Sequence, residues 1–206
     1  MNSSSPLAGA PLSVVILAAG QGTRMRSAQP KVLQKLAGRP LLSHVIDCAR
    51  ALEADDVCVV YGFGGDAVRA AFDGDDIRWA LQAEQLGTGH AVMQAMPGTP
   101  ERNRVLILFG DVPLLKPATL ERVVSGCGRG EAAVLTVEMD DPFGYGRIVR
   151  ENGRVVRNVE QKDASAEEQA IREINTGVLC LDAASLKAWL GRLRNDNRQG
   201  EYYLTD

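Results

Sequence analysis

The chain has 206 residues, of which 45% are apolar and 24% charged, and its formal net charge is −3. This length and composition are ordinary for one globular domain with a sizeable core. The charge balance gives no sign of the basic face that a nucleic-acid binder presents, so we expect no nucleic-acid partner. No apolar run approaches the roughly 20 residues of a membrane helix, so we expect no membrane partner either.

The four cysteines are not arranged as metal ligands. Cys58 and Cys180 lie within apolar runs, and no two cysteines have the spacing of a zinc site. We therefore expect buried, reduced thiols that pack as small apolar side chains. Reduced cysteines favour a cytoplasmic location.

The first half of the chain alternates between apolar strands and amphipathic helices. Residues 1–12 read as a disordered leader, rich in Ser, Gly, Ala and Pro, so that the folded domain spans 13–206. The pattern predicts strands at 13–17, 57–61, 77–81 and 105–109, and helices at 41–52, 66–72, 88–96 and from Pro117 to about Gly126. This alternation predicts an α/β fold with a Rossmann-like, mostly parallel sheet and helices on both faces.

The second half is richer in strands. Asn152-Gly153 is a strong hairpin signal between strands expected at 146–150 and 154–159. Further strands are expected at 132–138 and 174–181, with a helix at 183–193. We expect this half to add a subdomain that contains the β-hairpin.

A Gly-rich loop follows the first strand. Its sequence is Leu17-Ala18-Ala19-Gly20-Gln21-Gly22-Thr23-Arg24-Met25. Small residues let backbone N–H groups approach phosphates, and Arg24 adds a forked cation, with Lys31 a few residues later. An NAD-binding fingerprint would need Gly at position 25, and no P-loop motif occurs. The loop therefore predicts a phosphate site of another kind.

Two other strand ends carry polar groups. Asp111 follows the strand at 105–109, where a carboxylate could hold Mg²⁺ against triphosphate oxygens; a turn or cap role is the alternative. Gln82 begins a run, Gln-Ala-Glu-Gln-Leu-Gly-Thr-Gly-His, that ends at His90. An amide both donates and accepts, which suits the edge of a pyrimidine, although a solvated loop would explain the run equally well.

These segments together resemble the sugar-phosphate nucleotidyltransferases. The resemblance runs from Val14 to the end of the chain and includes Pro30-Lys31-Val32-Leu33, Gly110-Asp111-Val112-Pro113-Leu114, Gly144-Tyr145-Gly146-Arg147-Ile148, Glu173-Ile174-Asn175-Thr176-Gly177 and Gln199-Gly200-Glu201-Tyr202-Tyr203. Within that family the chain is most similar to the bacterial uridyltransferase domains that act on N-acetylglucosamine 1-phosphate. The resemblance implies transfer of UMP from UTP to that sugar phosphate, giving UDP-N-acetylglucosamine and pyrophosphate for cell-envelope precursors.

The resemblance also implies the site residues. Catalysis would rest on Arg24, Lys31 and Asp111, with Asp111 as the ligand of the Mg²⁺ cofactor. The nucleotide would be bound by Leu17, Ala18, Ala19, Gly20, Gly22, Lys31, Gln82, Gly87 and Thr88. The sugar would be bound by Phe109, Gly110, Gly146, Glu160, Asn175 and Thr205. Phe109 stands where these enzymes often have Tyr, so a hydroxyl contact is lost there.

The family implies more chain than this sequence contains. A second metal-binding Asn and an acetyltransferase β-helix would follow Asp206, and family members form homotrimers largely through that β-helix. We therefore expect this chain to be mainly monomeric. Three alternatives stay open: another sugar-1-phosphate nucleotidyltransferase, a binding module without catalysis, and a nucleotide-binding fragment that is inactive without its C-terminal segment.

Overall fold

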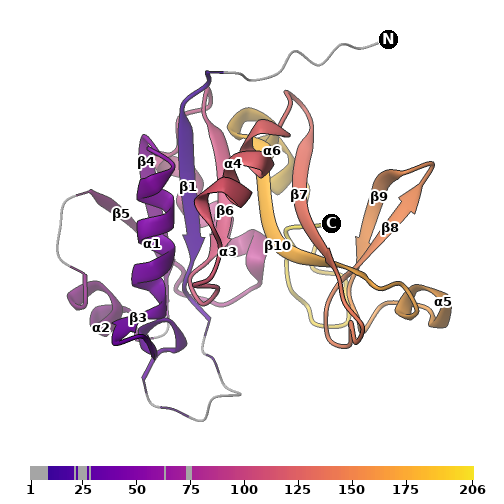
Figure 1. Ribbon diagram of the computed structural model, residues 1–206, viewed down its shortest axis with the longest axis horizontal. Coiled ribbons are helices and arrows are strands. Elements are labelled where there is room, and N and C mark those ends of the chain that lie inside the picture. Colours follow the sequence, from indigo (N-terminus) through magenta and orange to yellow (C-terminus); the bar gives the residue numbers. More distant parts are fainter. Residues whose placement is uncertain (1–8, 21, 23–26, 28, 63, 73–75) are drawn as a thin grey trace.

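The structure, a computed structural model, describes residues 9–206 except 21, 23–26, 28, 63 and 73–75 (Figure 1). Residues 1–8 of the expected leader lie outside this description. Strand β1 (Leu12–Leu17) begins one residue before the expected domain boundary, and the carbonyl of Pro11 accepts a hydrogen bond from the Arg104 backbone at 2.8 Å. Pro11 is thus tied to the sheet directly before β1.

Four parallel strands form the first half of the sheet, in the order β5-β4-β1-β6. They lie within one residue of the predicted ranges. Besides β1 they are β4 (Asp56–Tyr61), β5 (Ile77–Leu81) and β6 (Arg104–Phe109). The strands are parallel because each is followed by a helix that crosses back over the sheet, as the alternation of strand and helix predicts.

The second half of the chain continues the same sheet with antiparallel pairs. Strand β10 (Glu173–Asp182) pairs with β6, and β7 (Ala132–Glu138) pairs with β10. The predicted hairpin is β8 (Arg147–Glu151) and β9 (Arg154–Val159), which projects to the right in Figure 1. It joins β10 through the pairing of Ile174 with Arg147, so the hairpin is an extension of the main sheet.

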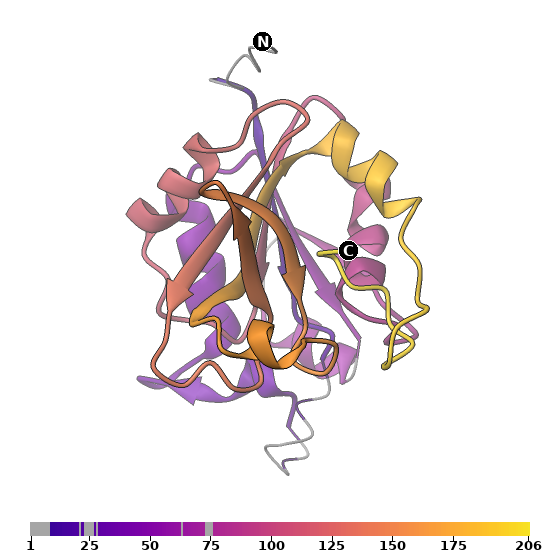
Figure 2. The same ribbon diagram turned by 90° about the vertical axis from the view of Figure 1, so that its right-hand side faces the viewer.

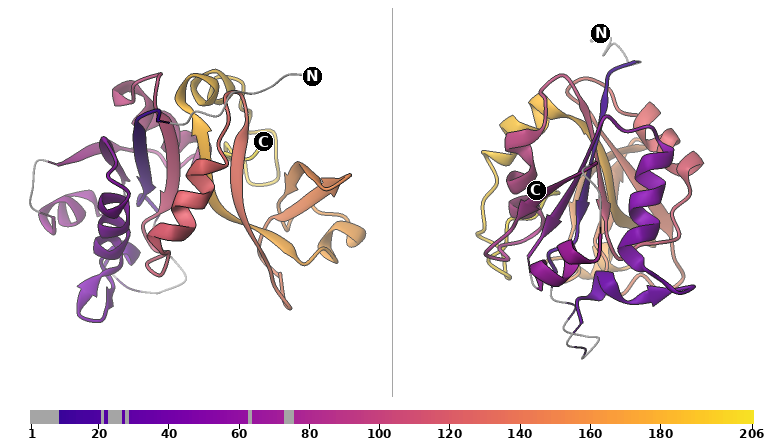
Figure 3. Two further views of the ribbon diagram at one scale, coloured as in Figure 1. Left: turned by 45° about the horizontal axis from the view of Figure 1, so that its top comes forward. Right: turned by 90° about the vertical axis from the view of Figure 1, so that its left-hand side faces the viewer.

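Helices cover both faces of the sheet (Figure 3). On one face lie α1 (Leu41–Ala51) and α4 (Pro117–Ser125), packed over Val14 and Ile16. On the other lie α3 (Thr88–Ala95) and α6 (Ala183–Leu190), packed over Val15 and Leu17. Successive strand side chains point to opposite faces, so a strand covered on both sides must be apolar throughout, as β1 is.

Several short elements were not predicted or differ in extent. Strands β2 (Lys35–Leu36) and β3 (Arg39–Pro40) and helices η2 (Lys31–Leu33) and η3 (Met96–Gly98) are too short to show any periodicity. Helix α5 (Ala166–Gln169) is polar, and a capping box made by Ser165 and Glu168 defines its start. Helix α2 (Gly65–Ala70) is shifted from the expected 66–72, and α6 ends at Leu190, before the expected end at 193.

The thiol prediction is confirmed, since all four cysteines are free and buried. Burial raises the pKa of the Cys58 thiol to about 11, so it stays protonated at neutral pH. Within the described residues, no helix is both long enough and apolar enough to cross a membrane.

Candidate functional site

The predicted site residues of the first half gather at one edge of the sheet. Strands β1, β4, β5 and β6 are parallel, so their carboxyl ends, at Leu17, Tyr61, Leu81 and Phe109, lie side by side. In open α/β sheets this edge is where ligands bind. The Gly-rich loop, Gln82 and Asp111 all follow directly from it.

The Gly-rich loop begins buried and then opens to solvent. Ala18 and Ala19 are buried, whereas Gly20 is exposed and has open space where a side chain would be. Gly22 has a φ of +59°, and a Cβ there would lie 2.8 Å from the Cβ of Lys31. Gly22 therefore packs against the Lys31 side chain. Arg24, the other expected phosphate ligand, lies outside the described residues.

Lys31 and Asp111 form an ion pair across this edge. Lys31 follows Pro30 at the start of η2, and Asp111 follows β6 through Gly110. Their side chains are 40% and 25% exposed, so both can reach a ligand. The backbone of Gly110 donates to Leu17 at 2.9 Å, and a Cβ at Gly110 would lie 3.2–3.3 Å from Val32, Leu42 and Ala18. The small residue lets the Asp111 turn sit close to the Gly-rich loop.

Gln82 is almost fully buried, with 4% of its surface exposed. Its Nε2 donates to the Gly87 carbonyl and contacts Nδ1 of His90, both at 3.1 Å. A carbonyl can only accept, so the orientation of the amide is fixed and Oε1 points away from both partners. No described residue donates a hydrogen bond to Oε1, so within this part of the chain Oε1 is an unused acceptor.

Gln85 ties this loop to the Gly-rich loop. Its Nε2 donates to the Ala19 carbonyl at 2.8 Å. Gly62 lies beneath the contact, since a Cβ there would be 2.9 Å from the Gln82 carbonyl oxygen and 3.1 Å from the Ala19 Cβ. Sequence reasoning assigned no role to Gly62 or Gln85 individually, because only the folded loops show their contacts.

The expected nucleotide residues Gly87 and Thr88 also hold the C-terminal stretch. A Cβ on Gly87 would lie 2.6 Å from the Tyr202 carbonyl oxygen, and Oγ1 of Thr88 accepts from the Leu204 backbone at 3.1 Å. Tyr202 in turn donates to the Leu86 carbonyl at 2.8 Å. Figure 2 shows this stretch leaving α6 and passing toward the hairpin. It thus links the first half of the site to the second.

Three of the expected sugar residues meet around Asn158, at the end of β9. Asn158 Nδ2 donates to Glu160 Oε1 at 2.9 Å and to Thr205 Oγ1 at 3.1 Å. A Cβ on Gly146 would lie 2.5 Å from Asn158 Oδ1 and 3.0 Å from Glu160 Oε1, so a larger residue there would displace the Asn158 side chain. Sequence reasoning missed Asn158, because a polar residue in a hairpin strand reads as a solvent-facing position.

Asn175 and Phe109 complete this second cluster. The Asn175 backbone donates to the Gly146 carbonyl at 2.9 Å, and its Oδ1 accepts from the Gly177 backbone at 2.8 Å. Gly177 has a φ of +80° at an irregularity in the β10 ladder, and a methyl group there would overlap the Phe109 ring. The Phe109 ring therefore packs directly against the backbone of Gly177, beside the cluster. A groove of about 1020 Å³ between β7 and the hairpin is lined by Asn158, Asn175 and Thr205, among other residues.

A buried arginine supports the loops of this cluster. Arg147 is 2% exposed and forms no ion pair with a described carboxylate; its guanidinium donates to the Tyr145 carbonyl and, at 2.8 Å, to Gln161 Oε1. Gln161 Oε1 also accepts from the Gly144 backbone at 3.0 Å. These bonds hold the turn before β8 against the chain after Glu160.

The chain end adds negative charge near Glu160. Burial raises the pKa of the Asp206 carboxyl above its usual value, and the carboxylates of Glu160, Asp163 and Asp196 raise it further. The surroundings of Glu160 are therefore acidic, and they suit neutral hydroxyl and amide groups better than a further anion.

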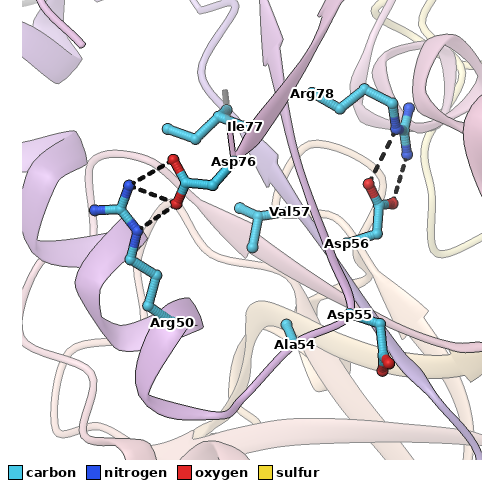
Figure 4. Close-up of a pocket in the computed structure, with 8 residues that line it drawn as sticks. All are labelled: Arg50, Ala54, Asp55, Asp56, Val57, Asp76, Ile77 and Arg78. Atoms are coloured by element: carbon cyan, nitrogen blue, oxygen red, sulfur yellow. Dashed lines mark hydrogen bonds and ion pairs between the residues drawn. The ribbon is translucent and has the colours of Figure 1, made fainter. Parts of the chain in front are cut away.

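A second pocket lies at the opposite edge of the sheet (Figure 4). Its arginines are already matched, since Arg50 binds both carboxylate oxygens of Asp76 and Arg78 binds both of Asp56. Arg78 also donates to the Ala95 carbonyl at 2.9 Å. These pairs join the amino ends of β4 and β5 to α1 and α3, so we assign the pocket a structural role.

The residues present fit a metal that is held mainly by the substrate. No cluster of three or more His, Cys, Asp or Glu side chains able to hold a metal occurs among the described residues. Asp111 offers one carboxylate at the phosphate edge. Mg²⁺ often binds through one or two carboxylates together with phosphate oxygens and waters, and this arrangement would serve it.

The fold is that of the nucleotidyltransferases. The chain superimposes on the crystal structure of a UDP-glucose pyrophosphorylase complexed with UDP-glucose with a TM-score of 0.74, covering 95% of this chain and 84% of that one at 17% identity. The model of the MobA-like NTP transferase domain matches residues 14–198, and the chain belongs to this family.

Curated relatives share much more of the sequence. The chain is 60% identical over 196 residues to the bifunctional protein GlmU of Azoarcus sp. and 59% identical over 196 residues to that of Aromatoleum aromaticum. Each match covers 95% of this chain and 43% of the relative, so the chain spans less than half the length of these proteins.

Proposed function

We propose that this domain transfers UMP from UTP to N-acetylglucosamine 1-phosphate, giving UDP-N-acetylglucosamine and pyrophosphate. The observation that carries the proposal is the juxtaposition of two half-sites. One is the strand edge with the Gly-rich loop, Gln82 and the Lys31–Asp111 pair; the other is the cluster around Glu160. The C-terminal stretch bridges them through Thr88 and Thr205. The identity to the GlmU proteins supports the same substrates.

The orientation of Gln82 supports uracil as the base. No described residue donates to its Oε1, and uracil presents an N3–H donor where cytosine presents an acceptor. A site that requires a donor rejects a base that places a second acceptor against it. Discrimination between uracil and cytosine would then follow from the Gly87 carbonyl, which fixes the amide.

The chemistry needs no protein nucleophile. A phosphate oxygen of the sugar phosphate attacks the α-phosphorus of UTP, and the bond from that phosphorus to the β-phosphate oxygen breaks, releasing pyrophosphate. Lys31, with Arg24 expected beside it, would stabilise the negative charge that grows on the phosphates, and the two half-sites would align the reactants. Mg²⁺, held by Asp111 and phosphate oxygens, would supply further charge neutralisation.

The sugar cluster supplies both donors and acceptors. Glu160 offers a carboxylate oxygen, and Thr205 and Asn175 offer a hydroxyl and an amide N–H₂ group. A 2-acetamido sugar presents hydroxyl donors beside a carbonyl acceptor and matches that set.

The test is pyrophosphate release from UTP, measured with and without the sugar phosphate. We expect release only with both substrates and Mg²⁺, with CTP and glucose 1-phosphate as matched poor substrates. Equal rates with UTP and CTP would contradict the assigned base, and a preference for glucose 1-phosphate would reassign the sugar. Nucleotide binding without turnover would identify a binding module or a fragment that needs more chain. We also propose a cytoplasmic location. We further propose a mainly monomeric state, and sedimentation would check the monomeric state.

A further inference from the structure

Asn158 occupies a position that the proposed activity leaves without a role. It lies one residue before the end of β9, and its side chain is the hydrogen-bonded centre of the cluster formed by Gly146, Glu160 and Thr205. We propose that Asn158 is a positioning residue that sets the hydrogen-bonding polarity of the sugar half-site. This inference rests on the proposed function.

The orientation of the Asn158 amide is fixed by Glu160. A carboxylate oxygen accepts hydrogen bonds, so Nδ2 is the amide atom that faces Glu160 Oε1, at 2.9 Å. The reversed amide would place Oδ1 against the carboxylate. In the observed orientation Oδ1 is buried and has no partner within the described chain, a cost that the two Nδ2 bonds must offset. The cluster thus has one amide orientation.

This orientation determines what Glu160 and Thr205 can offer a ligand. Asn158 occupies Glu160 Oε1, and Oε2 accepts no hydrogen bond from any described residue. Oε2 is therefore the oxygen left for a hydroxyl donor. Because Thr205 Oγ1 accepts from Asn158, its own O–H is free to donate. One side of the half-site accepts and the other donates.

Asn158 also joins segments that are far apart in the sequence. Glu160 follows the hairpin, whereas Thr205 belongs to the C-terminal stretch, 47 residues beyond Asn158. The pairing of Leu204 with Thr88 carries this link to the nucleotide half-site. The hydrogen bonds of one amide thus position an acceptor and a donor from two separate segments.

The test compares binding of UDP and UDP-N-acetylglucosamine by calorimetry. Asn158→Leu keeps the size of the side chain and removes both donors. We expect about a tenfold loss of affinity for UDP-N-acetylglucosamine, the scale of one or two lost hydrogen bonds, with UDP affinity unchanged. Asn195→Asp is the control for replacing an asparagine and for adding a charge. The Asn195 side chain is exposed and has no hydrogen bond to a described residue, so this variant should leave both affinities unchanged.

The pH dependence of sugar-nucleotide binding by Asn158→Asp is a readout that a merely structural role of Asn158 would not change. Two adjacent carboxyls raise the pKa of one of them, so lowering the pH from 7.5 to 5.5 should protonate the pair and restore an O–H donor toward Glu160. The carboxyls of Asp206, Asp163 and Asp196 lie in the same region as Glu160, so the unaltered chain is measured at both pH values. Affinity of the Asp variant for the sugar nucleotide should recover by at least about threefold relative to the Leu variant.

The outcomes separate the two proposals. If the unaltered chain binds UDP-N-acetylglucosamine no better than UDP, the proposed sugar half-site is wrong and the inference falls with it. If the unaltered chain shows the advantage and Asn158→Leu keeps it, only the role of Asn158 is wrong. An equal loss of UDP and sugar-nucleotide affinity, or no recovery of the Asp variant at pH 5.5, would reduce Asn158 to a structural residue. Should Asn158→Leu fail to fold, the pH series of the Asp variant decides alone.

Discussion

Replacement of Lys31 by Met should separate catalysis from stability. The Lys31–Asp111 pair is partly exposed, with side chains 40% and 25% accessible, so its contribution to folding should be only about 0–1 kcal/mol. Methionine keeps the apolar stem against which Gly22 is folded. The ammonium group, by contrast, faces the proposed phosphates, and loss of one preorganised donor typically lowers the rate about a hundredfold to a thousandfold, or about 2.7–4 kcal/mol.

The assay is pyrophosphate release at saturating UTP, sugar phosphate and Mg²⁺, beside a thermal or urea unfolding curve for each variant. Lys35→Met is the matched control, since Lys35 is exposed four residues further along and pairs with no carboxylate in the part of the chain that the structure describes. We expect Lys31→Met to unfold within about 1 kcal/mol of the unaltered chain while turnover falls at least about a hundredfold. Turnover within a factor of about three of normal would refute the phosphate role. A loss of stability well above 1 kcal/mol would mean that the pair holds the fold together.

Four further predictions use the same assays. Gln82→Leu leaves the Gly87 carbonyl and His90 without their buried donor. The free energy of unfolding should therefore fall by about 2–4 kcal/mol, and the preference for UTP over CTP should collapse. A retained preference for UTP would contradict the base assignment. Asp182→Ala removes the side-chain cap of α6 and should cost about 1–2 kcal/mol at pH 7, whereas Asp182→Asn should cost less. Burial alone would raise the pKa of the Asp182 carboxyl, but its backbone hydrogen bonds outweigh burial and hold the pKa below its ordinary value. The stabilisation that Asp182 provides is therefore present above about pH 4 and should fade in unfolding curves taken below that pH. An unchanged difference in stability between the unaltered chain and Asp182→Ala at about pH 3 would contradict this. Gly177→Ala forces a methyl group into the Phe109 ring and should cost about 1–3 kcal/mol and weaken sugar-nucleotide binding; a variant of normal stability would contradict the close packing. A chain extended past Asp206 should turn over faster than this one with similar UTP affinity, and equal turnover would show that the extra chain is dispensable.

The strands and helices of the first half could be predicted because they obey simple patterns. Val14 to Leu17 are apolar without a break, as a strand covered on both faces requires, and all of them are buried. The alternation with helices then implies parallel strands and a shared carboxyl edge. The places of the Gly-rich loop, Gln82 and Asp111 along that edge followed from chain order alone, and the structure confirms them.

The tertiary structure decided what those residues contact. That Lys31 pairs with Asp111, and that Gln82 points its amide at Gly87, depends on loops whose conformations no periodicity encodes. The same holds for the second half-site. The contact between Asn158 and Thr205 spans 47 residues and closes only when β10 returns to the sheet and brings the hairpin beside the C-terminal stretch.

The sequence by itself therefore determined the fold class and the edge on which the proposed nucleotide half-site lies, because burial and strand polarity are encoded in local patterns of apolar residues. Only the tertiary structure decided which amide orientations are allowed and which segments share the proposed sugar half-site. Hydrogen bonds have direction, and the partners that fix an amide such as that of Asn158 come from segments that are distant in the chain and adjacent only after folding.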